Sequence, residues 1–411
     1  MLSRRQILHG ASALGSGLAA GLALPHYAWA QGRLALEPAL PAGVLESAKL
    51  EALPGKAKLI KLTHRPPNYE TPVGYFNDLF TPNEAFFVRY HLANIPEISA
   101  ASWRLRVGGD AAATPLELTL DQLKKDYKAY EIAAVNQCSG NRRGMFSPHV
   151  PGVEWGPGAM GNALWKGARL KDVLAKAGLK KEAVEIVFDG ADGAILDKTP
   201  DFVKSIPVWK ALDENVLIAY EMNGKPLPHF NGFPARIIIP GWTGTYWMKH
   251  VVSIMAAAKP FSGFWMNPAY RVPLGKFPVV ERFLTQETAA NTPITEMVVN
   301  SLITNLADGH KSKPRQPIDV KGIAWDGGYG IAAVEVSTDG GKSWALATLG
   351  KDAGRFSFRQ WSYRFAPAKA GKYEVMVKAS NRIGQTQAPA LIFNPAGYHH
   401  NVIQKITIQV A

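Results

Sequence analysis

The chain has 411 residues, of which 46 are Lys or Arg and 33 are Asp or Glu, so its formal net charge is +13. Its 47% apolar and 19% charged residues are typical of a globular protein and exclude a disordered or collagen-like chain, and the length favours two domains. The single cysteine, Cys138, excludes an intrachain disulfide, a Cys-x-x-Cys-His haem attachment and a thiolate zinc or iron–sulfur site within this chain.

The basic residues are dispersed along the chain. Lysines cluster only in short groups, at 56–58, 124–125 and 180–181, and no nucleic-acid-binding signature accompanies them. Composition alone leaves nucleic acid, a membrane surface and small anions as partners of a basic protein. Because no basic stripe exists, we expect no nucleic-acid partner.

Residues 1–30 have the composition of an export signal. Arg4 and Arg5 precede a Gly- and Ala-rich run, and Ala28-Trp29-Ala30 provides a small-x-small cleavage site. The paired arginines resemble a twin-arginine signal. A short membrane anchor is the alternative, but the glycines make the run a poor spanning helix. We therefore expect a twin-arginine signal peptide, a periplasmic mature chain and no membrane span.

The next segment, residues 31–75, is rich in proline and lacks a periodic pattern. We expect an irregular arm wrapped on a body that begins near Phe76. Within that body, the run 86–91 alternates so that Arg89 and His91 share one face of a strand. Two such side chains suit an anion, although an ordinary surface arginine explains Arg89 equally well.

The body combines helical and strand patterns. Thr119 and Gln122 form a capping box that predicts a helix start, and the apolar spacing in 170–177 predicts a second helix closed by a glycine. Apolar runs at 186–188 and 237–239, bounded by Gly and Pro, predict buried strands. The pattern indicates a mixed α and β domain over residues 31–290, including the arm.

Cys138 follows the apolar run 132–135 and begins a loop that contains Gly140, Arg142 and Arg143. A thiol next to fixed positive charge is favoured as a thiolate, which is the form that binds metals or electrophiles. Free cysteine is also among the most frequently buried residues, so inert packing is the alternative.

The pattern changes in residues 291–411. Strands alternate at 334–336, 373–378 and 403–410, and Asp-Gly-Gly sequences at 326–328 and 339–341 supply turns with positive φ. Helical spacing is absent. These features are typical of an immunoglobulin-like β-sandwich without a disulfide. The fold class is therefore predicted as α+β, a mixed domain followed by a sandwich.

Several motifs in the same order resemble the sulfite oxidase family of mononuclear molybdenum enzymes. They extend over nearly the whole mature chain, and the second domain resembles the immunoglobulin-like dimerisation domain of that family. The motifs are Phe87-Val88-Arg89-Tyr90-His91, Cys138-Ser139-Gly140-Asn141-Arg142-Arg143, the run 161–167, the run 219–228, Gly232-Phe233-Pro234-Ala235-Arg236 and Pro240-Gly241-Trp242-Thr243-Gly244.

The resemblance implies one Mo-molybdopterin cofactor per chain. Cys138 would be the protein ligand to molybdenum, because a soft thiolate suits that metal. The pterin is anionic and needs cationic and amide partners. Asn231 stands where the family often has His and brings no charge. The positions that match the family's cofactor-binding residues are Arg89, His91, Asp192, Asn231, Arg236, Trp247, Met248 and Lys249.

The resemblance also implies a small anion-binding pocket beside the metal. Three guanidinium groups around one pocket repel one another unless an anion lies between them. Without the family match, Arg359 reads as a surface arginine of the sandwich. The matching residues are Arg89, Arg143, Arg359, Trp155 and Tyr270.

The function that the resemblance implies is oxidation of sulfite to sulfate, with two electrons passed one at a time to a c-type cytochrome. We expect no haem in this chain, and therefore a separate cytochrome as a subunit or a transient acceptor. The sandwich is expected either to form a homodimer or to face the cytochrome.

Three alternatives remain open. A sulfane dehydrogenase subunit of a thiosulfate-oxidising system would share the fold and the export. A plant-type nitrate reductase would normally have flavin and haem domains as well. The third alternative is a cofactor-free exported binding protein, which would contain no molybdenum.

Overall fold

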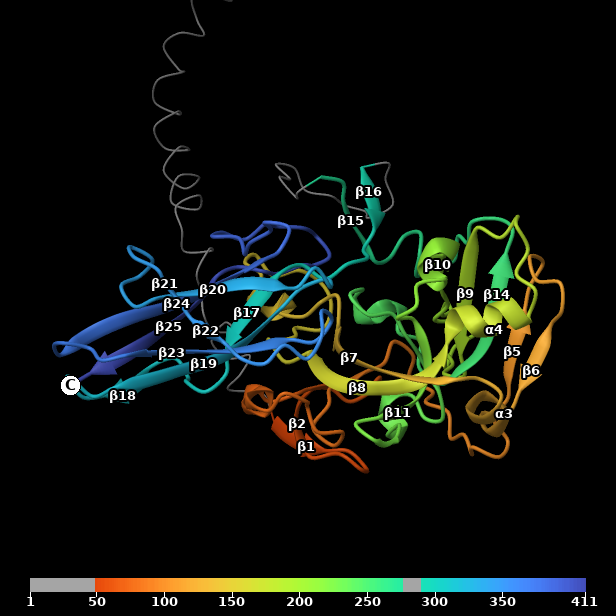
Figure 1. The fold of residues 1–411 in the computed structure, drawn as a ribbon, viewed down its shortest axis with the longest axis horizontal. Coiled ribbons are helices and arrows are strands. Elements are labelled where there is room, and N and C mark those ends of the chain that lie inside the picture. The colour runs from red at the N-terminus through yellow and green to blue at the C-terminus, as the bar shows by residue number, and fades with distance from the viewer. Residues whose placement is uncertain (1–48, 276–289) are drawn as a thin grey trace, which may run out of the picture.

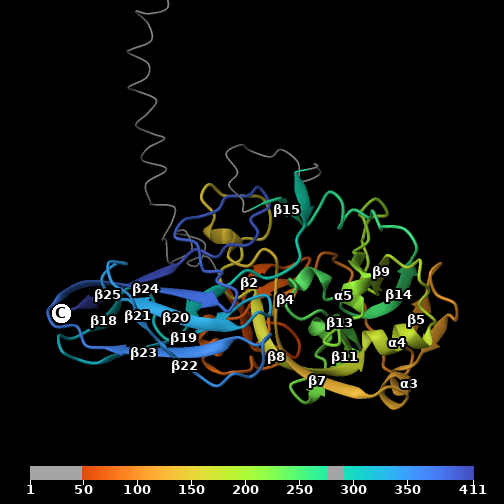
Figure 2. The ribbon, with the colours of Figure 1, turned by 45° about the horizontal axis from the view of Figure 1, so that its top comes forward.

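Two hydrophobic cores organise the described part of the chain. The computed structural model describes residues 49–275 and 290–411, and the predicted export signal at 1–30 lies outside them. The larger core consists mainly of residues from 49–275, hereafter the first body, and another lies in residues 290–411, hereafter the sandwich. Ile294, Phe356, Ala396 and Tyr398 of the second range also pack in the larger core. Figures 1 and 2 both show the sandwich at one end of the molecule, with the C-terminus at its tip. Within the described residues, no helix has the length and apolarity to span a membrane.

The arm is not irregular where the structure describes it, which corrects the prediction for that part of residues 31–75. It forms an antiparallel sheet with the strand that carries Arg89, because Asn68 and Tyr69 pair with Arg89 and Val88. Its strand Lys58–Thr63 has the sequence Lys-Leu-Ile-Lys-Leu-Thr, in which two apolar residues stand side by side, so strict alternation does not mark it as a strand. The sheet is β1 (Lys49–Ala52), β2 (Lys58–Thr63), β3 (Asn68–Glu70) and β4 (Val88–Arg89).

Two five-stranded sheets form the rest of the first body. The first has the order β10 (Lys204–Pro207), β9 (Glu185–Gly190), β14 (Val251–Ala257), β5 (Leu105–Gly108) and β6 (Leu116–Leu118), and only its β14–β5 pair is parallel. The second contains β12 (Lys225–Pro226), β11 (Leu217–Met222), β8 (Met160–Arg169) and β7 (Ala129–Gln137), and β13 (Arg236–Ile238) also pairs with β11. Outside these sheets, β15 (Arg271–Pro273) pairs with β16 (Asn291–Pro293).

The described helices are short, and the predicted capping box is present. The Thr119 side chain accepts the backbone N–H of Gln122, whose side chain accepts the backbone N–H of Thr119 in return. The second predicted helix is closed by Gly178, whose φ is +68°. The α-helices are α3 (Leu120–Lys125), α4 (Leu170–Lys176) and α5 (Val208–Ala211), and the 3₁₀ turns are Val73–Asn77, Arg143–Met145, His229–Asn231 and Gly244–Tyr246.

Residues 290–411 form the predicted β-sandwich. Gly328, Gly340 and Gly341 adopt the positive φ that the turns require. One sheet has the order β17 (Asn300–Ile303), β19 (Ile318–Trp325), β23 (Arg359–Phe365) and β22 (Thr348–Leu349). The other has the order β18 (His310–Ser312), β25 (Gln404–Val410), β24 (Gly371–Asn381), β20 (Ile331–Ser337) and β21 (Ala345–Leu346).

A third apolar cluster joins the two parts at the end of β7. Val135 and Met160 of the first body pack in one cluster with Trp325 and Phe358 of the sandwich. The backbone N–H of Val135 donates to the Phe356 carbonyl at 2.9 Å. Figure 1 shows β7 and β8 extending toward the sandwich. The strand that leads into Cys138 is therefore fixed from both sides.

Arg142 adds a buried polar link across the same interface. Its guanidinium donates to the Asn300 side chain at 2.7 Å and to the Ser301 carbonyl at 2.8 Å, and it lies over the Trp325 ring. Only 2% of Arg142 is exposed, so its charge has lost its hydration. Such a group stabilises an interface only while its partners are in place.

We expect Arg142→Met to lower the free energy of unfolding by about 2 kcal/mol, because two charge-assisted hydrogen bonds between the domains are lost. Urea unfolding followed by tryptophan fluorescence measures this loss. Arg364→Met is the control, since it removes a guanidinium whose ion pair with Asp319 is exposed. Equal stability of the two variants would contradict the role of Arg142.

Candidate active site

Cys138 lies directly after β7, in a loop that its backbone contacts hold in place. Its N–H donates to the Ala159 carbonyl at 2.9 Å, and its carbonyl accepts the N–H of Asn141 at 3.0 Å. The thiol is the only cysteine of the chain and is 7% exposed. The run before it is apolar, as β7 burial requires, so the sulfur is presented at a defined point between the two domains.

Glu70 of β3 holds the neighbouring segment 156–158, and Gly156 of this segment accepts the backbone N–H of Arg142 in the Cys138 loop. The Glu70 carboxylate accepts the backbone N–H groups of Gly156 at 2.7 Å and Gly158 at 2.8 Å. A Cβ on Gly158 would lie 2.0 Å from the Thr71 carbonyl oxygen, so only glycine allows this approach. Burial raises the pKa of Glu70 to about 7, although both N–H groups oppose the shift.

Two cavities meet at the cysteine. The inner cavity lies between the first-body strands, and the outer cavity, about 550 Å³ in volume, lies between the first body and the sandwich. Arg89, Cys138 and Tyr270 line both cavities. A group held in the inner cavity and a molecule that enters the outer cavity would therefore meet at the Cys138 sulfur.

All eight residues predicted to bind the cofactor line the inner cavity together. They come from β4, β13 and the segments around β9 and β14, which are far apart in the sequence. Val88 and Tyr90 pack in an apolar cluster with Leu59 and Tyr69, and Arg89 and His91 line the cavity, whose wall Tyr90 also joins. The predicted residues in this wall are Arg89, His91, Cys138, Asp192, Asn231, Arg236, Trp247, Met248, Lys249 and Tyr270.

His91 and Tyr270 form a hydrogen-bonded pair where the two cavities meet. The His91 Nε2 atom and the Tyr270 hydroxyl are direct partners, and the ring of Phe202 stacks on His91 with centroids 3.7 Å apart. Burial and then the nearby Arg89 charge lower the pKa of His91 well below its usual value. Burial raises the pKa of Tyr270, and Arg89 opposes this shift. At neutral pH the pair therefore consists of a neutral imidazole and a protonated phenol.

The outer cavity has a wall from the sandwich that the sequence analysis missed. The ring of Tyr398 stacks on Tyr270 at a centroid distance of 5.6 Å, and the Arg143 guanidinium carbon lies 5.3 Å from its centroid. Arg143 also donates from Nε to the Ala396 carbonyl at 3.0 Å. The sandwich therefore fixes the orientation of Arg143, and no local sequence pattern connects position 398 with position 143.

The inner cavity has an excess of positive charge. Arg236 is buried in its wall and Arg89 and Lys249 are partly buried there, whereas Asp192 is the one carboxylate among its lining residues in the described structure. Burial lowers the pKa of Lys249 well below its usual value, and the Asp192 charge counteracts this. Burial raises the pKa of Asp192, and Lys249 opposes that shift. Uncompensated buried cations are unfavourable, so the wall suits an anionic ligand.

Unpaired polar atoms in the same wall indicate a ligand that forms hydrogen bonds. Buried polar atoms are normally paired, so each exception requires an explanation. A ligand rich in donors, acceptors and negative charge, as an anionic pterin is, would satisfy these atoms. The unpaired buried atoms among the lining residues are Asn136 Oδ1, Ser139 Oγ, Arg236 Nε and Thr245 Oγ1.

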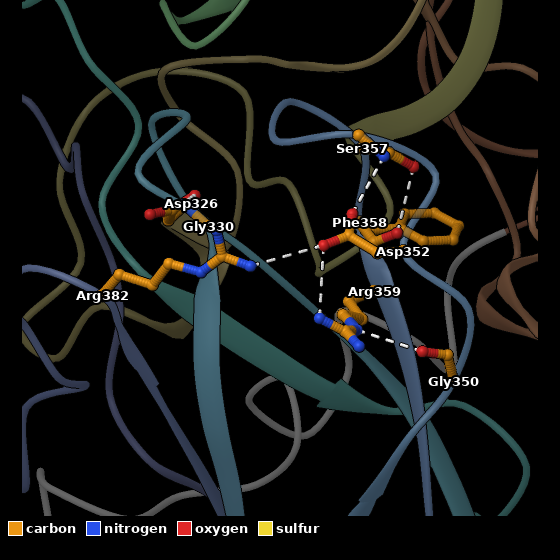
Figure 3. Close-up of polar contacts among 9 residues, drawn as sticks. Asp326, Gly330, Gly350, Asp352, Ser357, Phe358, Arg359 and Arg382 are labelled. Atoms are coloured by element: carbon orange, nitrogen blue, oxygen red, sulfur yellow. Dashed lines mark hydrogen bonds and ion pairs between the residues drawn. The ribbon is translucent and has the colours of Figure 1, made fainter.

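Arg359 lies away from both cavities, which corrects its predicted place beside Arg89 and Arg143. It is the first residue of β23, and its guanidinium pairs with Asp352 at 3.3 Å and donates to the Gly350 carbonyl at 3.1 Å (Figure 3). Arg382 approaches the same Asp352 carboxylate at 3.6 Å (Figure 3). Arg359 therefore has its carboxylate partner within the sandwich. The outer cavity is lined by two guanidinium groups, those of Arg89 and Arg143, and not by three.

Trp155 also lies one layer behind its predicted position. Its ring is fully buried and contacts the edge of Phe87, which itself lines the inner cavity, and Trp155 lines neither cavity. Its role in this structure is to support that wall.

Lys56 was missed by the sequence analysis as well, although its side chain donates to Asn231. Within the described residues, no group of three or more His, Cys, Asp or Glu side chains is placed to hold a metal.

Comparison with known families matches both parts of the chain. Residues 91–265 match the oxidoreductase molybdopterin binding domain, and residues 291–411 match the Mo-co oxidoreductase dimerisation domain. The first match contains most of the inner-cavity residues together with Cys138 and Arg143. The second contains Tyr398 and the other sandwich residues of the outer cavity.

Sulfite oxidases and one solved structure are similar to this chain over most of its length. The chain is 34% identical to sulfite oxidase of Gallus gallus over 82% of this chain and 74% of that protein. It is also 34% identical to mitochondrial sulfite oxidase of Homo sapiens over 85% of this chain, but spans only 65% of that protein's length. The crystal structure of the sulfane dehydrogenase SoxCD from Paracoccus pantotrophus has the same fold, with a TM-score of 0.72 at 24% identity over 93% of this chain and 94% of that chain.

Glu70 provides a test of the support behind Cys138. Its pKa in the folded chain, about 7, exceeds the ordinary value of 4.5, so the folded state binds the proton more tightly than the unfolded state. We expect the stability contributed by Glu70 to be complete below about pH 4.5 and to fall by about 3 kcal/mol as the pH rises through 7. Glu70→Gln removes this titration. Urea unfolding of both proteins between pH 5 and 8 measures the difference, and parallel curves would contradict the assignment.

Proposed function

Because the chain belongs to the sulfite oxidase family of molybdenum oxidoreductases, we propose that it oxidises sulfite to sulfate at a mononuclear molybdenum-pterin centre. The single observation that supports this proposal most is the junction of the two cavities at Arg89, Cys138 and Tyr270. It offers one thiolate ligand on the cofactor side and guanidinium groups on the side that a small anion enters.

The inner cavity would hold the cofactor. Arg89, Arg236 and Lys249 supply positive charge for the anionic pterin, and the unpaired Ser139 and Thr245 hydroxyls supply hydrogen bonds. Cys138 would supply the thiolate for molybdenum. When bound, the molybdenum group accepts two electrons and mediates the oxygen transfer, while the protein provides ligation, charge and shape.

The outer cavity would bind the substrate. Arg89 and Arg143 face the space beside Cys138 and attract the negatively charged sulfite, and the Arg143–Ala396 contact keeps one guanidinium in position. The Tyr270 hydroxyl, protonated at neutral pH, can donate to a substrate oxygen. The overall reaction combines sulfite with water and yields sulfate, two protons and two electrons.

For those electrons we propose a separate c-type cytochrome as the acceptor, either a subunit or a transient partner. We also propose that the chain is exported to the periplasm by the twin-arginine pathway, on the basis of residues 1–30 alone. The match to a dimerisation domain supports a homodimer formed through the sandwich.

A second candidate is a sulfane dehydrogenase. The shared fold with SoxCD and the volume of the outer cavity favour it, because about 550 Å³ exceeds what a sulfite ion needs. Apolar residues also line this cavity, among them Val150, Val153 and Phe393. A larger sulfur-bearing substrate would use that apolar wall, whereas free sulfite would leave it unfilled.

The deciding experiment measures sulfite-dependent reduction of cytochrome c by purified protein of known molybdenum and pterin content. Rapid turnover of free sulfite supports sulfite oxidation, and turnover only with a larger sulfane compound supports the second candidate. Nitrate reduction by a reduced dye would instead indicate nitrate reductase activity. Stoichiometric hydrogen peroxide would argue against a cytochrome acceptor, and a chain without molybdenum would indicate a binding protein.

We expect Cys138→Ser to lower sulfite turnover below detection while leaving the fold intact, because a neutral hydroxyl is a poor ligand for molybdenum. Cytochrome reduction and circular dichroism measure the two properties. Substantial activity in a variant with normal molybdenum content would contradict the assignment of Cys138.

The two arginine positions provide a matched pair. We expect Arg143→Met to raise KM for sulfite by about tenfold or more, since it removes a charged contact from the outer cavity. Arg359→Met should leave KM unchanged, because its guanidinium pairs with Asp352 in the sandwich. Steady-state kinetics at constant ionic strength compares the variants, and equal effects would refute this division of roles.

A further inference from the structure

Lys56 connects the arm with the wall of the inner cavity. It lies between β1 and β2, and its side chain enters the first body, where only 8% of the residue remains exposed. Its ammonium group donates to the carbonyls of Asn83 at 2.7 Å and Phe86 at 3.0 Å, and to Asn231 Oδ1 at 2.5 Å. All three donor positions of this lysine are therefore used inside the protein.

Asn231 is the residue through which Lys56 reaches the cavity. Its Oδ1 atom accepts from Lys56, and its Nδ2 atom donates to the Phe87 carbonyl at 3.1 Å. Its backbone carbonyl accepts from Arg236 at 2.9 Å. Asn231, Phe87 and Arg236 all line the inner cavity, so the contact with Lys56 fixes a polar segment of its wall.

The charge of Lys56 has no direct partner of opposite sign among the described residues. Its three acceptors are neutral, and no described carboxylate lies within ion-pair distance. Burial lowers its pKa to about 7, and the more distant Glu84 opposes this shift. The residue therefore adds to the positive charge that Arg236 and Lys249 already concentrate at this wall. An anion in the cavity would stabilise the charged form of Lys56.

We propose that Lys56 is a positioning residue for the anionic molybdenum-pterin cofactor: it fixes Asn231 in the cavity wall and adds a buried positive charge behind it. The arm thereby contributes to cofactor retention, and a bound cofactor in turn holds the arm on the first body. This inference depends on the pterin cofactor of the family and not on sulfite as the substrate.

The test compares Lys56→Met with Lys61→Met in the full-length holoprotein. Methionine preserves the length of the side chain and removes the charge. Lys61 belongs to the same arm but pairs with Glu51 at a half-exposed position. Pterin and molybdenum per chain are measured after purification, and the rate of pterin release is followed by fluorescence in 0.5 M salt. We expect about tenfold faster release from Lys56→Met and release at the wild-type rate from Lys61→Met.

If Lys56 only anchored the arm to the first body, the same experiment would give a different result. In that case Lys56→Met lowers the melting temperature of the cofactor-free and cofactor-loaded proteins equally, and the pterin content and release rate stay at wild-type values. The proposal instead requires that the stabilisation by the cofactor, measured as the difference between the two melting temperatures, becomes smaller. Wild-type release from Lys56→Met would overturn it.

If Lys56→Met does not fold, Lys56→Gln replaces it. Glutamine is neutral but can still donate hydrogen bonds to neighbouring acceptors, while Asn231 itself stays unchanged. Faster pterin release supports the proposal, and release at the wild-type rate overturns it. Since neither readout uses sulfite, failure here is distinct from failure of the proposed activity.

Discussion

An excess of positive charge in a largely buried wall beside one thiol is the constraint on which the site depends. Arg89, Arg236 and Lys249 surround an inner cavity whose lining contains a single described carboxylate, Asp192. Such a wall is electrostatically unfavourable until an anion enters, because buried cations lose their hydration. The unpaired polar atoms in the same wall add a need for hydrogen bonds. Both features fit the anionic pterin of this enzyme family, and both lead to Cys138.

The position of that thiol depends on two domains. Cys138 directly follows β7 of the first body. The end of β7 packs against the sandwich through Val135, and in the following loop Arg142 donates a hydrogen bond to Asn300. The sandwich also provides Tyr398, which stacks on Tyr270, and the Ala396 carbonyl that holds Arg143. A change within the sandwich therefore reaches the substrate side of the site.

Arg142, Arg143 and Arg359 have different roles in this structure. Arg142 is buried in the interface between the domains, whereas its neighbour Arg143 faces the outer cavity. Arg359 is balanced by Asp352 and faces neither cavity. The partner of each guanidinium decides its role: a carbonyl and a carboxamide fix Arg142, a carboxylate neutralises Arg359, and Arg143 keeps donors available for an anion.

The sequence by itself determined the features that depend on near neighbours in the chain. The capping box at Thr119, the positive-φ glycines, the alternating strands of the sandwich and the loop after β7 are local, and the order of motifs identified the family. Only the tertiary structure decided which distant side chains meet. The strands in the arm, the contact of Lys56 with Asn231, the place of Tyr398 and the exclusion of Arg359 all depend on packing between segments far apart in the sequence. Local periodicity carries no information on such pairings, because charge balance and burial are settled only when the domains pack together.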